Sequence, residues 1–154
     1  MEIENRLFIE IVFKVAAVLI LLTSSFEDLR EKKISILFPA AEMVLSIAYT
    51  GYLWSQGDFS LKLMLANMLP GAMMLVVSAI TGMELGTGDG LMALSMGPIF
   101  GFCDMSVAIM LSFLFSSAGS IILLVLRRVS ARSRLAFLPY LTMGVGVMCF
   151  ASFG

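Results

Sequence analysis

The sequence contains no histidine and only two cysteines among its 154 residues. Without histidine, the chain has no imidazole to move a proton or to activate a nucleophile. Cys103 and Cys149 lie in or beside apolar runs and form no Cys-x-x-Cys pair, so no structural zinc site is expected. This inventory therefore excludes a structural zinc site and any mechanism that depends on histidine.

Charged residues are also scarce, at 14% of the chain, and they gather in a few clusters. A nucleic-acid-binding domain carries a broad basic face, and this distribution argues against one. Hydrophobic residues make up 60% of the sequence, and its mean hydropathy is +1.01. A soluble domain of this size could not bury that much apolar surface, so the chain is expected to lie in a lipid bilayer.

The apolar residues fall into six runs, which predict an all-α, polytopic membrane protein with about six transmembrane helices in one domain, 1–154. A helix needs roughly 20 residues to span the hydrocarbon core. The expected spans are 7–26, 34–54, 61–81, 88–102, 105–126 and 136–153. Two acids precede the first run and no small-residue cleavage site follows it, which indicates a retained span rather than a signal peptide.

The stretch from Gly90 to Leu126 is too long for one span. As a single helix it would measure about 55 Å, against a hydrocarbon core of about 30 Å. A break is therefore expected around Gly97-Pro98, Gly101 and Asp104. Pro70-Gly71 predicts a kink in the third span.

Basic residues divide the expected loops into two unequal sets. The loops expected on one side of the membrane are 27–33, 82–89 and 127–134. They hold seven basic residues, whereas the opposite side holds only Arg6 and Lys62. Because basic loops remain in the cytoplasm, both termini are expected on the extracytoplasmic side. Asp28 and Asp89 then share the cytoplasmic face.

Asp89 lies in a small-residue segment with Gly86, Gly88 and Gly90, between two apolar runs. An acid costs about 2.5–3.5 kcal/mol at the centre of a membrane helix and less near its end, so its presence indicates a function. Two close carboxyl groups can share one proton. The ionised group then takes a proton from water and the protonated group donates one, which is a chemistry that hydrolyses a peptide bond. We expect Asp28 and Asp89 to form such a pair.

Other acids are alternatives or accessories to this pair. Glu27 and Glu84 flank the two aspartates and are rival members, although each could simply lie in headgroup water. Glu42 has no partner nearby in sequence and should face the protein interior, as an accessory to the site or as a packing acid. Asp28 taken alone could be an ordinary acid at the membrane interface.

Three patches resemble the prepilin peptidases, the membrane aspartic proteases that cleave the leader peptides of type IV pilin-like proteins. Asp28-Leu29-Arg30, followed by Lys33-Ile34, is similar to the family's first-aspartate segment. Gly86-Thr87-Gly88-Asp89-Gly90-Leu91, followed by Gly97 and Gly101, is similar to its Gly-x-Gly-Asp segment. Ala136-Phe137-Leu138-Pro139-Tyr140-Leu141 and Gly144 resemble the pattern of its last helix.

This resemblance implies a short, peptidase-only enzyme of the Flp/Tad pilus type in the inner (cytoplasmic) membrane. Its substrate would be a prepilin with a basic leader and an apolar helix, cut at the cytoplasmic face without a cofactor. Asp28 and Asp89 would be catalytic, and the supporting loop residues would be Gly86, Gly88, Gly90, Arg30 and Lys33. No N-methylation is expected, because the cysteine-rich segment of the bifunctional members is absent.

The sequence departs from the family pattern at two places. Ile34-Ser35-Ile36 stands where the family often has Ile-Pro-Asn, and Leu91 stands where a lysine is common. Three other functions are considered: a protease similar to presenilin and signal peptide peptidase, a small proton-coupled transporter using Asp28, Glu42 and Asp89, and a structural partner in a secretion machine. The transporter would need acids at several membrane depths, whereas the two aspartates are expected at one level.

Overall fold

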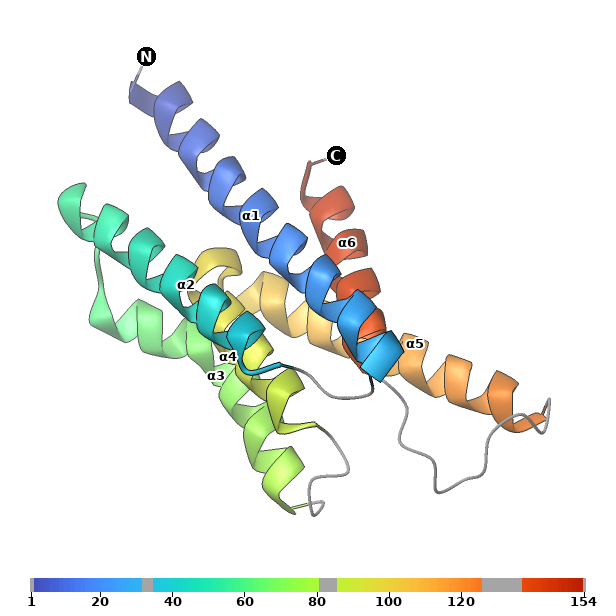
Figure 1. Ribbon diagram of the computed structural model, residues 1–154. Coiled ribbons are helices and arrows are strands. Elements are labelled where there is room, and N and C mark those ends of the chain that lie inside the picture. Colours follow the sequence, from blue (N-terminus) through green and yellow to red (C-terminus); the bar gives the residue numbers. More distant parts are fainter. Residues whose placement is uncertain (1, 32–34, 81–85, 126–136, 154) are drawn as a thin grey trace.

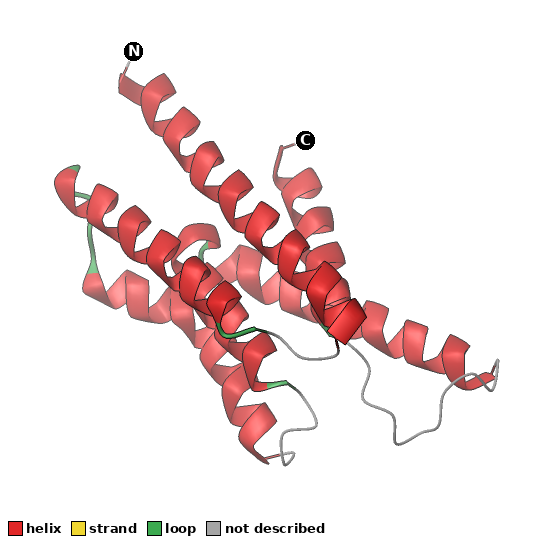
Figure 2. Cartoon of the chain, viewed as in Figure 1, coloured by secondary structure: helices red, strands yellow, loops and turns green. Residues whose placement is uncertain are grey.

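Six α-helices contain nearly all the residues that the structure describes. The structure, a computed structural model, describes residues 2–31, 35–80, 86–125 and 137–153. The helices are α1 (Glu2–Glu31), α2 (Leu37–Ser55), α3 (Leu61–Ile80), α4 (Thr87–Phe100), α5 (Phe102–Val125) and α6 (Leu138–Phe153). They alternate in direction, so that α1 begins and α6 ends toward the same end of the molecule (Figure 1). No strand occurs in the described ranges, and the predicted all-α class is confirmed (Figure 2).

Three of the helices are long and apolar enough to cross a membrane. They are the main part of α1 (Glu4–Arg30), all of α3 and most of α5 (Phe102–Ile122). Helix α4 has 14 residues and a length of about 21 Å, and the apolar part of α6 is also shorter than a full span. Many large apolar side chains are exposed on the outside of the helices, among them Ile80 and Phe150. This surface is that of a membrane-associated protein.

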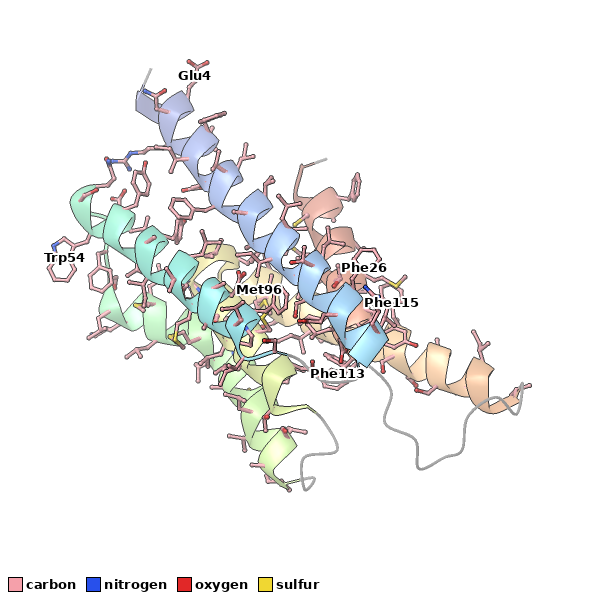
Figure 3. All side chains as sticks on the ribbon, in the orientation of Figure 1. Glu4, Phe26, Trp54, Met96, Phe113 and Phe115 are labelled. Atoms are coloured by element: carbon pink, nitrogen blue, oxygen red, sulfur yellow. The ribbon has the colours of Figure 1, made fainter. Side chains whose placement is uncertain are left out.

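Helix α4 lies at the centre of the molecule. It packs against α1, α2, α3 and α5, and its residues from Ser95 to Phe100 are all buried. Figure 3 shows Met96 in the interior, whereas Trp54 points outward from the end of α2. A helix that is apolar on all sides is stable when other helices surround it. The central position of α4 explains why Asp89, in its first turn, is buried.

Two glycines allow α3 and α4 to pack with their backbones almost in contact. A Cβ added at Gly71 in α3 would overlap the backbone of Ala93 and Leu94, and one added at Gly97 in α4 would overlap the carbonyl of Asn67. Small residues at such points are typical of membrane helix pairs. The close approach of the α3 and α4 backbones therefore depends on the lack of a side chain at Gly71 and at Gly97.

Gly71→Ala is expected to lower the free energy of unfolding by about 1–3 kcal/mol, because the added methyl group forces α3 away from α4. Gly51→Ala in α2 is the matched control, since no atom lies within 4 Å of the Cβ that it would add. That control should gain about 0.5–1 kcal/mol from its better helix propensity. Unfolding in detergent micelles measures both changes, and equal stability of the two variants would contradict the packing described.

The break between α4 and α5 is one residue, Gly101. Its φ of +86° lies in a region that favours glycine, and the backbone N–H of Phe102 donates a 3.0 Å hydrogen bond to Oδ1 of Asn67 in α3. The predicted break is confirmed here, but Pro98 remains inside α4 and Asp104 lies in the first turn of α5. Helix α3 likewise continues through Pro70.

Two predicted loop boundaries are wrong. Helix α1 continues to Glu31, so residues 27–31 are helical, and α4 begins at Thr87, so residues 87–89 are helical. The sequence from Glu27 to Glu31 contains good helix formers and neither glycine nor proline, which explains the extension. Both aspartates are therefore held on helices and not on loops.

Candidate functional site

Asp28 lies near the end of α1, where it meets the beginning of α6. Its side chain is 6% exposed, and its carboxylate accepts a hydrogen bond from the backbone N–H of Leu138. Leu138 is the first residue of α6, and the next residue, Pro139, has no N–H to offer. The N–H groups of a first helical turn lack partners within the helix, and a carboxylate there is stabilised by the helix dipole. Asp28 thus caps α6 from a different helix.

Asp89 caps its own helix, α4. It is the third residue of α4, and its carboxylate accepts a hydrogen bond from the backbone N–H of Gly86, the residue that precedes the helix. In return, the carbonyl of Gly86 accepts the N–H of Asp89 at 3.1 Å. This is the acidic half of a capping box, which explains why the Gly-Thr-Gly-Asp segment folds as a helix start. The second oxygen of Asp89, Oδ1, is buried without a hydrogen-bond partner among the described residues.

The structure brings Asp28 and Asp89 into one site. Helix α1 packs against α4, Asp89 is only 4% exposed, and the two carboxyl groups are near enough to act on each other electrostatically. Each of them has one backbone N–H donor, from α6 or from the start of α4. Two buried carboxyl groups that come within hydrogen-bonding distance of each other can share a proton and act as an acid and a base.

The predicted glycines lie in or beside the first turn of α4 and have different neighbours. A Cβ added at Gly86 would lie 2.9 Å from Oδ2 of Asp89 itself, and one at Gly90 would lie 2.7 Å from Cδ2 of Leu75 in α3. Gly90 therefore allows the start of α4 to pack on α3. Gly88 lies between Thr87 and Asp89 and is half-buried.

The remaining predicted residues occupy different positions. Glu27 precedes Asp28, and its Oε2 is buried without a partner among the described residues. Arg30 is exposed in the last turn of α1. Lys33 and Glu84 lie outside the described residues. No group of three histidine, cysteine, aspartate or glutamate side chains that could hold a metal ion occurs within the described ranges.

Glu42 is fully buried in α2, and both of its carboxyl oxygens lack a partner among the described residues. Helices α1 and α2 are antiparallel, and their register is fixed by the ring of Phe13, whose centroid lies 5.2 Å from that of Tyr49 and 6.5 Å from that of Tyr52. Glu42 is therefore level with about residue 21 of α1. At 1.5 Å per residue it lies about 10 Å from Asp28 along the helix axis. It is not part of the aspartate pair.

Sequence reasoning missed two groups at this site. The Leu138 N–H was not identified, although Leu138 falls in the third patch of the family resemblance and Pro139 is typical of a first helical turn. Ser24, one turn before Asp28, was also missed. It is fully buried and its Oγ has no partner in the part of the chain that the structure describes.

Comparison with known proteins does not identify this chain. No family profile, no curated protein and no solved structure matches it. Its function is therefore argued from its own residues, namely the three sequence patches and the geometry of the aspartate pair.

Proposed function

We propose that the protein is a membrane aspartic endopeptidase that removes the leader peptide of type IV pilin-like, Flp-type prepilins at the cytoplasmic face of the inner membrane. The observation that carries this proposal is that two aspartates, Asp28 from α1 and Asp89 from α4, are both buried and near enough to act on each other electrostatically. The residues around them are those that resemble the prepilin peptidases. The enzyme does not methylate its product.

The proposed reaction uses the pair and one water molecule. The ionised carboxylate takes a proton from the water while the water oxygen attacks the carbonyl carbon of the scissile peptide. The protonated carboxyl group donates its proton as the amine leaves. Oδ1 of Asp89 is buried without a partner among the described residues, and this supports the proposal because such an oxygen can bind a water molecule or the peptide.

We also propose that all six helices lie in the membrane, with both termini on the extracytoplasmic side. The alternating directions of α1 to α6 support this arrangement (Figure 1). It brings the ends of α1, α3 and α5 and the beginnings of α2, α4 and α6 to one end of the molecule. The aspartate pair lies at that end, where a substrate helix in the membrane would meet its cytoplasmic leader.

A proton-coupled transporter is the second candidate function, and the burial of Glu42 favours it. Intramembrane acids without partners are typical of proton pathways. However, about 10 Å separates Glu42 from Asp28 along the helix axis. A proton pathway would need further groups to bridge this distance, whereas the peptidase needs only the two aspartates and a water molecule.

The test is a cleavage assay in vesicles that contain the protein and a Flp-type prepilin tagged on its leader. The wild type should release the leader, and the double variant Asp28→Asn with Asp89→Asn should not. Both proteins should be present at equal levels, and the new amino terminus should be unmethylated by mass spectrometry. Equal cleavage by the double variant, or no cleavage of Flp-type prepilins by the wild type, would reject the proposal.

A further inference from the structure

The hydroxyl group of Ser24 lacks the hydrogen bond that eight other serine and threonine hydroxyl groups make in the described helices. Serine and threonine side chains in a helix commonly donate a hydrogen bond to a carbonyl three or four residues earlier. This bond is made by Thr23, Thr50, Ser55, Ser95, Ser106, Ser112, Ser120 and Thr142. Ser24 is fully buried, yet its Oγ has no partner among the described residues.

Ser24 and Asp28 lie on the same face of α1. Residues four apart in a helix are neighbours, with Cβ atoms about 5–6 Å apart. Both side chains are buried, and α1 packs against α2, α4 and α6. Ser24 therefore lies one helical turn from the aspartate pair, on the side of the pair that leads toward the centre of α1.

The pair and its surroundings contain three buried oxygens without partners among the described residues. They are Oγ of Ser24, Oε2 of Glu27 and Oδ1 of Asp89. Buried polar atoms are almost always hydrogen-bonded, and exceptions are concentrated where a ligand or water binds. Of the three side chains, Ser24 is the one that carries a hydrogen-bond donor at every pH. A hydrogen-bond donor beside the aspartate pair could stabilise the negative charge that develops on the carbonyl oxygen during peptide hydrolysis.

We propose that Ser24 is a further catalytic residue, whose hydroxyl group donates a hydrogen bond to the carbonyl oxygen of the scissile peptide. This inference rests on the proposed peptidase function. As water attacks, its oxygen bonds to the carbonyl carbon, the π electrons move to the carbonyl oxygen, and one water proton passes to the ionised carboxylate. When the C=O bond re-forms, the C–N bond breaks and the nitrogen takes the proton of the other carboxyl group. The Ser24 hydroxyl keeps its proton throughout.

Ser24→Ala is expected to reduce kcat about 100-fold or more, the usual loss when one donor to a developing oxyanion is removed. Its KM should stay close to that of the wild type, because the bond strengthens only as charge develops on the oxygen. The thermal midpoint in detergent should be unchanged or higher, since the substitution removes a buried polar atom that has no partner. Steady-state cleavage kinetics and thermal unfolding measure these quantities on the full chain in vesicles and micelles.

Ser112→Ala is the matched control. Ser112 is also fully buried, but its hydroxyl donates to the carbonyl of Ala108 at 2.6 Å and belongs to α5. This variant should keep the wild-type kcat and lose thermal stability, the opposite of the pattern expected for Ser24→Ala. Comparison of the two variants thus distinguishes a catalytic hydroxyl group from a structural one.

The outcomes distinguish this inference from the proposed function. A wild type that cleaves the prepilin, together with Ser24→Ala at the same kcat, would overturn the role of Ser24 and leave the peptidase intact. A loss of activity in Ser24→Ala that follows a lower thermal midpoint would assign Ser24 to folding and also overturn its catalytic role. A wild type that cleaves no Flp-type prepilin would overturn both proposals.

Discussion

Asp89→Asn is expected to slow cleavage about 10²–10⁴-fold while leaving the protein folded. The asparagine side chain keeps an oxygen that can accept the Gly86 N–H, so the start of α4 retains its cap. An amide can neither accept a proton from water nor deliver one to the leaving amine, so the chemistry is lost. Asp28→Asn should behave in the same way, with its oxygen still accepting the Leu138 N–H.

The alanine variants at the same positions provide the comparison. Asp89→Ala and Asp28→Ala remove the acceptor as well as the acid, so each should be as inactive as the asparagine variant and also less stable, by about 1 kcal/mol. In the proposed mechanism the two aspartates act as a unit, so the double asparagine variant should be no less active than either single variant. Leader release and thermal unfolding are measured on the same preparations. Cleavage at the wild-type rate by any of these variants would show that the wrong acids have been paired.

Glu42→Leu is expected to raise the free energy of unfolding by about 1–3 kcal/mol, which is the cost of burying a polar group without partners. Glu42 is fully buried and neither of its oxygens has a partner in the described ranges. A leucine of similar size removes this cost and keeps the apolar contacts of α2. Cleavage should persist, since Glu42 lies about 10 Å from Asp28 along α1.

Glu42→Gln is the control for this substitution. Glutamine has nearly the same shape, but its amide also needs partners, so this variant should gain little stability. Unfolding in detergent and leader release measure the two effects separately. If Glu42→Leu abolished cleavage, Glu42 would have a role in the reaction, and if it lowered the free energy of unfolding, Glu42 would not carry the cost expected of a buried group without partners.

The sequence alone predicted the helices well and their ends less well. The six apolar runs correspond to the six helices, because hydrophobicity and length decide where a membrane helix forms. The end of α1 was misplaced because apolarity stops at Phe26 while helix propensity continues to Glu31. Gly71 was noted only beside Pro70, whereas its main role is the close contact with α4, which depends on a residue far away in the sequence.

For the site, the sequence predicted which acids meet and not what holds them. Asp28 and Asp89 were paired from the expected topology, and in the structure both are buried and near enough to act on each other electrostatically, while their pairing in catalysis stays a prediction. Their hydrogen-bond donors are backbone N–H groups, which every residue except proline carries and which no sequence pattern marks. Ser24 was missed for a related reason, since only the structure shows that its hydroxyl group is buried without a partner among the described residues.

The hydrogen bond from Leu138 to Asp28 joins the first helix of the chain to the last. During synthesis, α1 is made well before α6, and until α6 is made the Asp28 carboxylate lacks this donor. A chain synthesised only as far as α5 therefore holds both aspartates without the N–H donor of Leu138. For the proposed peptidase, the order of synthesis would then delay cleavage until α6 is in place.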